Sequence, residues 1–303
     1  MKRAYLNLAL LVIVAGLAAT VWFTQKKEQK GAPLTTLSAD AVNSISIAHP
    51  DQPTIELEKK GAEWQLVEPV QSPTDPFEVA SLVNLATQET KRTLKVADVK
   101  LADLKLDPPQ FTITLNDQKL DFGDTEPLEY HRYVRHGDTI ALIDDPSATA
   151  VDADYSNLVA KELISPGAEI EKIDVPGLSV SRSDGKDWSA TPASDAASGD
   201  AIAKFVEAWR AARSMWNAAM PDDGGKGQPI TITTKGGAIH LVLVSEQPQL
   251  IIDRPDLKIR YSLSKADADT LLKLAPPKPA EDAGPDTASA PTHKTDDAKP
   301  AEK

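Results

Sequence analysis

The chain has 303 residues, and its 33 lysines and arginines against 45 aspartates and glutamates give a formal net charge of −12. This acidic balance argues against a nucleic-acid-binding protein, because phosphate binding draws its affinity from clustered lysine and arginine. The absence of cysteine excludes disulfides, thiolate metal sites and cysteine nucleophiles.

The first predicted element is an apolar run over residues 4–23. Twenty helical residues span about 30 Å, which is the thickness of the hydrocarbon core of a bilayer. We expect residues 1–30 to form an uncleaved membrane anchor with its flanks; a cleaved signal peptide and a buried core helix are the alternatives. The basic side chains that flank the run nearly balance. The soluble region is expected outside the cytoplasm, on the periplasmic side of a bacterial inner membrane.

A linker at residues 31–39 is predicted to lead into a first α+β unit over residues 40–165. Apolar and polar residues alternate in its early segments, which is typical of strands with one buried face. The expected landmarks are, in chain order, a strand with Trp64, a helix capped by Asp75, strands at Phe111 and Ile140, and a closing helical pattern at Leu158.

The same succession recurs over residues 166–275, so we predict an internal repeat, with a chance succession of elements as the alternative. Its counterparts are Trp188, a helix capped by Asp200 and carrying Trp209 to Trp216, strands at Ile230 and Ile259, and a last helix that starts at Ser264. The predicted fold class is therefore α+β: a transmembrane helix, then two tandem repeats of antiparallel sheet with packed helices. Residues 276–303 are rich in proline, alanine and charge, and are expected to be disordered.

Several short motifs lie in a fixed order in the first unit. They are Trp64 followed by Pro69, Pro73-Thr74-Asp75, Leu104-Lys105-Leu106-Asp107-Pro108, Phe122-Gly123, Tyr133-Val134-Arg135 and Lys161-Glu162-Leu163-Ile164. In this order they resemble the bacterial domain of unknown function 4340 family, most strongly over residues 60–165. The family usually has glycine where Lys105 stands, which leaves the backbone geometry of that turn open.

The resemblance implies a membrane-tethered, extracytoplasmic accessory protein, because members are often anchored at the N-terminus. Relatives also occur with auxiliary components of ABC-type transport systems, including those linked to gliding motility. We therefore expect a non-enzymatic protein with a protein partner in an envelope or ABC-type transport assembly. The alternatives are a module that binds envelope glycan or polymer through Trp64 and Trp188, and a hydrolase with an unrecognised site. The family brings no established catalytic residues.

Direct inspection of the residues predicts no catalytic, cofactor or metal site. His131 and His136 differ by an odd number, so on a regular strand they point to opposite faces. We expect two solvated histidines there, rather than a metal site with Asp124 or Glu129. The glycine-rich loop at residues 222–227 lacks the spacing of a phosphate-binding loop and is expected to be a flexible hairpin connection.

Two surfaces are candidates for partner binding. Their residues are Arg132, Tyr133, Arg135, Trp209, Arg213 and Trp216. Arginine and tyrosine on one strand could bind a partner's carboxylates or an anionic glycan, or could cover the sheet and pair with local acids. The two tryptophans, seven residues apart on the predicted helix, could form an exposed strip or a buried contact between the two units.

Overall fold

The computed structural model describes residues 31–144, 154–183, 187–193 and 197–274, together with Val14 and Gly16. Apart from those two residues, the apolar run at 4–23 lies outside the described residues, and so does the predicted tail at 276–303. Within the described part of the chain, no helix has the length and apolar character needed to cross a membrane.

The first half of the described chain forms one antiparallel sheet of nine strands in the order β4-β3-β2-β1-β6-β7-β8-β9-β5. Its strands are β1 (Ser44–Ala48), β2 (Ile55–Lys60), β3 (Glu63–Glu68), β4 (Ser72–Pro73), β5 (Thr90–Lys95), β6 (Phe111–Leu115), β7 (Gln118–Thr125), β8 (Arg132–His136) and β9 (Thr139–Ile143). Its helices are α2 (Pro76–Asn84) and the short 3-10 helices η1 (Ala39–Ala41), η2 (Leu85–Thr87), η3 (Val96–Asp98), η4 (Leu101–Leu104) and η5 (Tyr155–Leu158).

The second half forms an eight-stranded sheet in the order β12-β11-β10-β14-β15-β16-β17-β13. Its strands are β10 (Ile170–Val175), β11 (Leu178–Ser183), β12 (Asp187–Thr191), β13 (Trp216–Ala219), β14 (Gln228–Thr234), β15 (Gly237–Ser245), β16 (Leu250–Arg254) and β17 (Ile259–Leu263). Its helices are α4 (Gly199–Ala211) and α5 (Lys265–Leu271).

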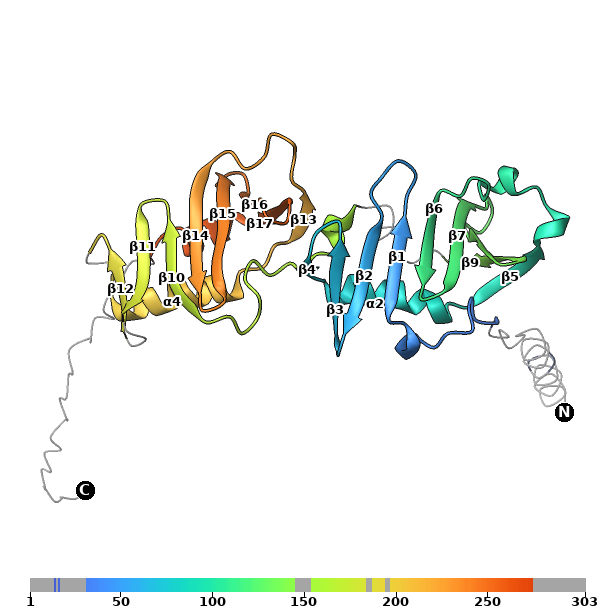
Figure 1. Ribbon diagram of the computed structural model, residues 1–303, viewed down its shortest axis with the longest axis horizontal. Coiled ribbons are helices and arrows are strands. Elements are labelled where there is room, and N and C mark those ends of the chain that lie inside the picture. The colour runs from blue at the N-terminus through green and yellow to red at the C-terminus, as the bar shows by residue number, and fades with distance from the viewer. Residues whose placement is uncertain are drawn as a thin grey trace, which may run out of the picture.

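The two sheets share one strand order once the two-residue strand β4 is set aside. Trp64 on β3 corresponds to Trp188 on β12, and α2 and α4 occupy the same place in the succession. Figure 1 shows the sheets next to each other along the longest axis, with α2 and α4 near the lower ends of the strands in that view. The predicted α+β class with two mostly antiparallel sheets is confirmed.

The helix starts show which capping predictions hold. Asp75 caps α2, since its carboxylate accepts a hydrogen bond from the Phe77 amide at 2.9 Å. Ser264 begins α5 in a capping box with Asp267, as predicted. The prediction of Asp200 as a cap is wrong. Ser198 caps α4 by accepting from the Ala201 amide at 3.2 Å, and Asp200 lies in the first turn.

The end of α4 also differs from the prediction. The helix stops at Ala211, and Ala212 turns to an extended conformation with ψ 119°. Its carbonyl accepts a hydrogen bond from the Leu163 amide at 3.1 Å, so contact with another segment replaces the next helical turn. Trp216 consequently lies on the edge strand β13 and does not share a helix face with Trp209.

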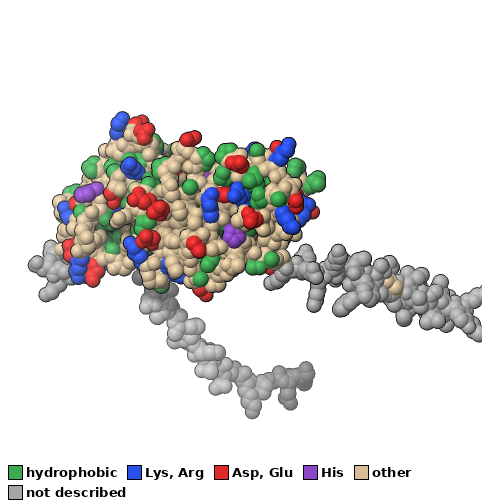
Figure 2. All heavy atoms as spheres, turned by 45° about the vertical axis from the view of Figure 1, so that its right-hand side comes forward, with side chains coloured by type: hydrophobic (Ala, Val, Ile, Leu, Met, Phe, Trp, Pro, Cys, Tyr) green, Lys and Arg blue, Asp and Glu red, His purple; other side chains and the backbone are tan. Residues whose placement is uncertain are grey.

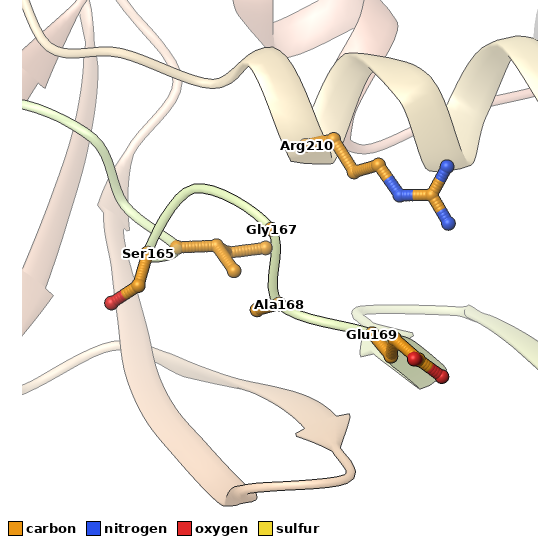
Figure 3. Close-up of a pocket in the computed structure, with 6 residues that line it drawn as sticks. Ser165, Gly167, Ala168, Glu169 and Arg210 are labelled. Atoms are coloured by element: carbon orange, nitrogen blue, oxygen red, sulfur yellow. The ribbon is translucent and has the colours of Figure 1, made fainter.

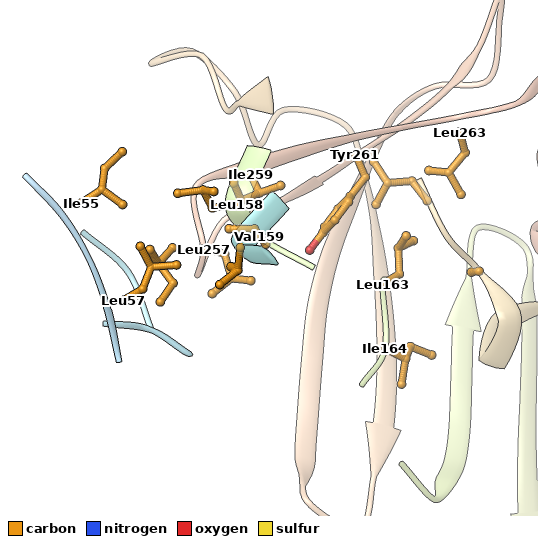
Figure 4. Close-up of a cluster of buried hydrophobic side chains, with 14 of the residues drawn as sticks. Ile55, Leu57, Leu158, Val159, Leu163, Ile164, Leu257, Ile259, Tyr261 and Leu263 are labelled. Atoms are coloured by element: carbon orange, nitrogen blue, oxygen red, sulfur yellow. The ribbon is translucent and has the colours of Figure 1, made fainter. Parts of the chain in front are cut away.

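One continuous hydrophobic cluster runs through both halves. In Figure 4, Leu158 and Val159 lie between Leu57 of β2 and Tyr261 of β17. The hydroxyl of Tyr155 in η5 adds a polar tie, because it donates to the carbonyl of Leu257 at 3.1 Å. The two sheets are thus joined through a shared core rather than by a bare linker.

The turn at Lys105 keeps a geometry that suits glycine. Lys105 has φ 52° and ψ 36°, in the left-handed region, and closes η4. Its ammonium lies 2.6 Å from Asp124 Oδ2. The hydrogen bond from Lys105 lowers the pKa of Asp124, with a further contribution from the Thr125 amide. The turn that the resemblance left open therefore has the backbone of the family's glycine, with lysine in its place.

Replacing Lys105 by glycine is expected to raise the pKa of Asp124 toward its usual value, as measured by NMR titration of the carboxyl group. A depressed folded-state pKa stabilises the fold above the unfolded pKa, and this contribution is lost as pH falls through the folded pKa. The variant should lose less stability on acidification. At neutral pH its stability should change by no more than about 1 kcal/mol, because relief of the left-handed backbone offsets the lost ion pair.

Lys119→Ala is the control. It removes the ammonium that pairs with Asp121 and should leave the pKa of Asp124 unchanged. An unchanged pKa of Asp124 in the glycine variant would contradict the assignment.

Candidate functional site: a groove at the junction of the sheets

Residues 158–164, here called the junction segment, lie between the two halves of the molecule. Four backbone hydrogen bonds hold the segment: Asp75 N to Leu158 O at 2.8 Å, Ala160 N to Pro73 O at 3.0 Å, Leu163 N to Ala212 O at 3.1 Å, and Ser214 N to Lys161 O at 2.9 Å. The first two reach β4 and α2 of the first half, and the last two reach the chain after α4. The segment is therefore fixed from both sides.

Charged side chains cross the same junction. The carboxylate of Asp75 is 1% exposed, and its Oδ2 lies 3.5 Å from Lys161 Nζ and 3.4 Å from Arg213 Nη2. Arg213 also pairs with Glu162. Asp75 thus caps a helix of the first half while it meets cations from the junction segment and from the second half.

A groove of about 680 Å³ opens beside this junction. Its lining residues are Ala39, Asp40, Lys59, Ala62, Glu63, Trp64, Gln65, Pro73, Thr74, Pro76, Ala80, Val83, Asn84, Ala160, Glu162, Ser165 and Pro166. Trp64 is partly buried and packs against the core, so its ring is held in place while one side faces the groove. The lining combines an aromatic ring, prolines and small apolar side chains with a few charged groups.

Trp188 does not join Trp64 in this groove. It lies on the edge strand β12, partly buried against the core, with the guanidinium of Arg182 5.7 Å above its ring. The two tryptophans hold corresponding positions in the two sheets, but only Trp64 lines the groove. The pair can therefore separate an effect of the groove from an effect of tryptophan packing.

The junction lies within a part of the chain that matches a known family. The family model described as domain of unknown function (DUF4340) matches residues 64–219, just over half of the chain. The chain belongs to the DUF4340 family. No curated protein and no solved structure matches it. The DUF4340 match runs from Trp64 on β3 to the last residue of β13, well past residue 165, and so takes in both sides of the junction.

Two of the motifs that resemble the DUF4340 family lie away from the groove and are explained by packing. Phe122 stacks on Phe111 with ring centroids 4.6 Å apart. A β-carbon on Gly123 would lie 2.3 Å from the carbonyl oxygen of Leu104, so only glycine lets the η4 turn pack there. The Leu104–Pro108 and Phe122-Gly123 motifs therefore fit each other as one packing unit. Trp64, Pro73 and Thr74, in contrast, line the groove.

Two of the predicted partner-binding residues are buried and cannot contact a partner in this structure. Arg132 donates to Gln110 Oε1 and to the Gly123 carbonyl, both at 3.0 Å, and its guanidinium lies 5.6 Å from the centre of the Phe111 ring. Trp209 is 0% exposed and donates from Nε1 to the Leu271 carbonyl at 2.9 Å. Both side chains contribute to the packing of the interior, because each forms its hydrogen bonds there.

The other four predicted residues do not form one surface. Tyr133 and Arg135 are partly exposed on the opposite face of β8 from Arg132. Arg213 belongs to the ion pairs of the junction, and Trp216 is 46% exposed on β13. Sequence reasoning identified Trp64 as a possible binding residue but missed the rest of the groove. The Pro73-Thr74-Asp75 motif was the local signal that could have pointed to it.

A second pocket and the surface charges offer fewer functional groups than the groove does. A smaller pocket of about 260 Å³ is lined by Ile164, Ser165, Gly167, Ala168, Glu169 and Arg210. Figure 3 shows the Ser165 hydroxyl and the Arg210 guanidinium directed away from each other, so these two groups do not converge on one point. Over the face seen in Figure 2, acidic and basic side chains are interspersed. None of the described residues that line the larger groove is a histidine.

Proposed function

We propose that this protein is a non-enzymatic, membrane-anchored, extracytoplasmic accessory protein of an envelope or ABC-type transport assembly, and that it binds a segment of a protein partner in the Trp64 groove. The observation that carries the proposal is the tryptophan- and proline-lined groove of about 680 Å³ set on the junction between the sheets. The family resemblance supports the class of assembly.

The lining of the groove favours a polypeptide segment as its occupant. Grooves with aromatic and proline side chains accept extended or proline-rich segments, whose ordering on binding costs little entropy. Tryptophan is also the side chain most often found at the energetic centre of an interface. Lys59, Glu63 and Glu162 supply charges of both signs for the polar groups of such a segment.

The junction supports binding by holding the groove walls in place. The walls come from β3, β4, α2 and the residues after η5, which are joined by the backbone hydrogen bonds and by the ion pairs of Asp75. A preorganised groove avoids the cost of ordering loops on binding. We further propose that the two sheets are copies of one unit, of which the second braces the groove through Arg213.

Anchoring would make a weak interface sufficient. We propose that the run at residues 4–23 is the transmembrane anchor, which keeps the groove near the membrane and raises the effective concentration of a membrane-bound partner. The start of the described range 31–144 is tied to the first sheet, since Ala32 O accepts from the Thr90 amide at 3.0 Å and from its hydroxyl at 2.9 Å. Motion at the anchor would then be passed to the sheet that carries the groove.

One observation favours a second candidate function. Because a side of the Trp64 ring faces the groove, it offers a stacking platform for a sugar ring, and the protein would then bind an envelope glycan or polymer. The two functions differ in what the full-length protein captures in the cell.

In-cell crosslinking of the full-length protein, with identification of what co-purifies, tests the proposal through Trp64→Ala. We expect this variant to lose recovery of protein partners, ABC-type subunits among them, by about tenfold or more. Trp188→Ala is the matched control and should recover them like the wild type. Thermal unfolding checks the fold, because the loss of a partly buried tryptophan should cost about 1–3 kcal/mol in either variant. Equal recovery by the Trp64 variant, or capture of polymer alone, would overturn the proposal.

A further inference from the structure

The loop between β7 and β8 brings a histidine and two glutamates together, far from the Trp64 groove. The Glu126 amide donates to the His131 carbonyl at 2.9 Å, which closes the loop. Tyr130 has φ 58°, a left-handed conformation that turns the chain back on itself. As a result Glu126, Glu129 and His131 face a common point, although they are three and five residues apart.

The donor atoms of this cluster have the spacing of a metal site. His131 Nδ1 lies 2.9 Å from Glu126 Oε1 and 3.3 Å from Glu129 Oε2, and the three ligand atoms lie within 4.8 Å of one another. Zinc bonds to nitrogen and oxygen ligands are about 2.0–2.2 Å long, so tetrahedral ligands stand about 3.3–3.6 Å apart. The two distances from His131 Nδ1 are close to this spacing, so the cluster could accept a cation with side-chain shifts on the order of an ångström.

Further side chains orient two of the three ligands, His131 and Glu126. His131 Nε2 lies 3.2 Å from Asp144 Oδ1, and Asp144 is held by Lys91 at 2.9 Å. Glu126 uses its other oxygen, Oε2, to accept from Arg92 at 3.0 Å. When Nε2–H donates to Asp144, Nδ1 is the nitrogen that faces the two glutamates, and either a proton on Nδ1 or a metal ion can lie between them. A carboxylate behind the remote nitrogen is the usual support of a metal-bound histidine.

We propose that Glu126, Glu129 and His131 bind one divalent cation of the zinc class. The set of one imidazole and two carboxylates suits zinc and chemically similar ions, and the two carboxylates balance the charge of the ion. The side chains of Glu126 and His131 are 10% and 15% exposed, whereas that of Glu129 is 73% exposed. The site therefore opens to solvent on the Glu129 side, where water or a group of a partner can take the fourth position.

Zinc titration of the full-length chain, purified in detergent and stripped with a chelator, tests the proposal by calorimetry. We expect one zinc ion per chain for the wild type, and a rise of the thermal unfolding temperature with added zinc. His131→Gln should abolish both effects. Asp144→Asn, which keeps all three ligands, should weaken zinc binding about 10- to 100-fold.

His136→Gln is the matched control, because His136 ends β8, the strand that His131 directly precedes, but contacts Gln118 at 3.0 Å instead of a carboxylate. It should bind zinc like the wild type. The proposal is overturned if the wild type shows no stoichiometric binding, or if His131→Gln binds zinc as well as His136→Gln does. A circular dichroism spectrum of each variant shows whether it is folded, and a misfolded His131 variant is replaced by Glu129→Gln, an exposed position with the same expected loss.

Discussion

Replacing Asp253 by alanine is expected to lower the free energy of unfolding by about 3 kcal/mol, because it leaves a partly buried arginine without its buried counter-charge. Asp253 is 0% exposed on β16 and lies directly opposite Arg260 on β17. Its carboxylate accepts from Arg260 Nε at 2.7 Å and from Nη2 at 2.9 Å, a bidentate pair of the strong kind. The Gly225 amide donates to the same carboxylate at 2.9 Å.

The arginine cannot relieve this loss by giving up its proton. The hydrogen bond to Asp253 raises the pKa of Arg260 above an ordinary value that is already far from neutral. Because arginine stays protonated at ordinary pH even without that bond, the guanidinium in the alanine variant remains charged, partly buried and short of an acceptor. The loop at residues 222–227 also loses the contact made by Gly225. This loop joins β13 to β14, which are not neighbours in the sheet, so its prediction as a hairpin connection is wrong.

Urea unfolding, followed by tryptophan fluorescence, measures the effect. Asp256→Ala is the control, because Asp256 pairs with Arg254 but its side chain is 56% exposed. An exposed pair contributes little, so this variant should stay within about 1 kcal/mol of the wild type. If Asp253→Ala also stays within that range, the pair of Asp253 and Arg260 does not make the expected contribution to the stability of the fold.

Many strands and most caps were predictable because their signals are local. Alternation placed several strands of each sheet, among them those at Phe111, Ile140, Ile230 and Ile259, but not β5 or β13. A capping residue followed by an apolar face placed α2 and α5. The Ser198 cap was missed because two capping residue types stand close together there, and only the hydrogen bond distinguishes Ser198 from Asp200. The end of α4 was missed because contact between Ala212 and Leu163 overrides a helical pattern that continues in the sequence.

The positions of charged side chains were harder to predict. Arg132 was expected to bind a partner's carboxylates or an anionic glycan, or to cover the sheet and pair with local acids. It lies instead on the buried face of β8, and its guanidinium donates to Gln110 and to the Gly123 carbonyl. The sequence around Arg132 does not indicate that its hydrogen-bond partners are Gln110 and Gly123, which lie 22 and nine residues earlier in the chain.

The Trp64 groove and the cluster around His131 could not be recognised from the sequence for the same reason. The groove draws its walls from segments as far apart in the chain as Ala39 and Pro166, so only Trp64 and its neighbouring motif could be recognised in the sequence. The expectation that His131 is solvated assumed a regular strand. A register shift in β7 and the left-handed Tyr130 break that regularity and bring Glu126 to the histidine. Irregular backbone, which local patterns describe poorly, creates this cluster.

The second large effect is expected at the junction. Asp75→Ala should lower the free energy of unfolding by about 3 kcal/mol, because it removes both a helix cap and the buried partner of two cations. The cap alone is worth about 1 kcal/mol. The rest comes from Lys161 and Arg213, which lie 3.5 Å and 3.4 Å from the carboxylate and would keep their charges without it.

Asp75→Asn separates these two contributions, because asparagine caps a helix as well as aspartate does but carries no charge. Denaturant unfolding should place it between the wild type and Asp75→Ala, with the larger part of the loss remaining. Asp200→Ala is the control: this exposed first-turn acid of α4 pairs only with Lys204 among its described charged neighbours, and its loss should cost less than about 1 kcal/mol. If the asparagine variant is as stable as the wild type, the ion pairs do not hold the junction, and the bracing of the Trp64 groove by the second sheet would have to rest on the shared apolar core alone.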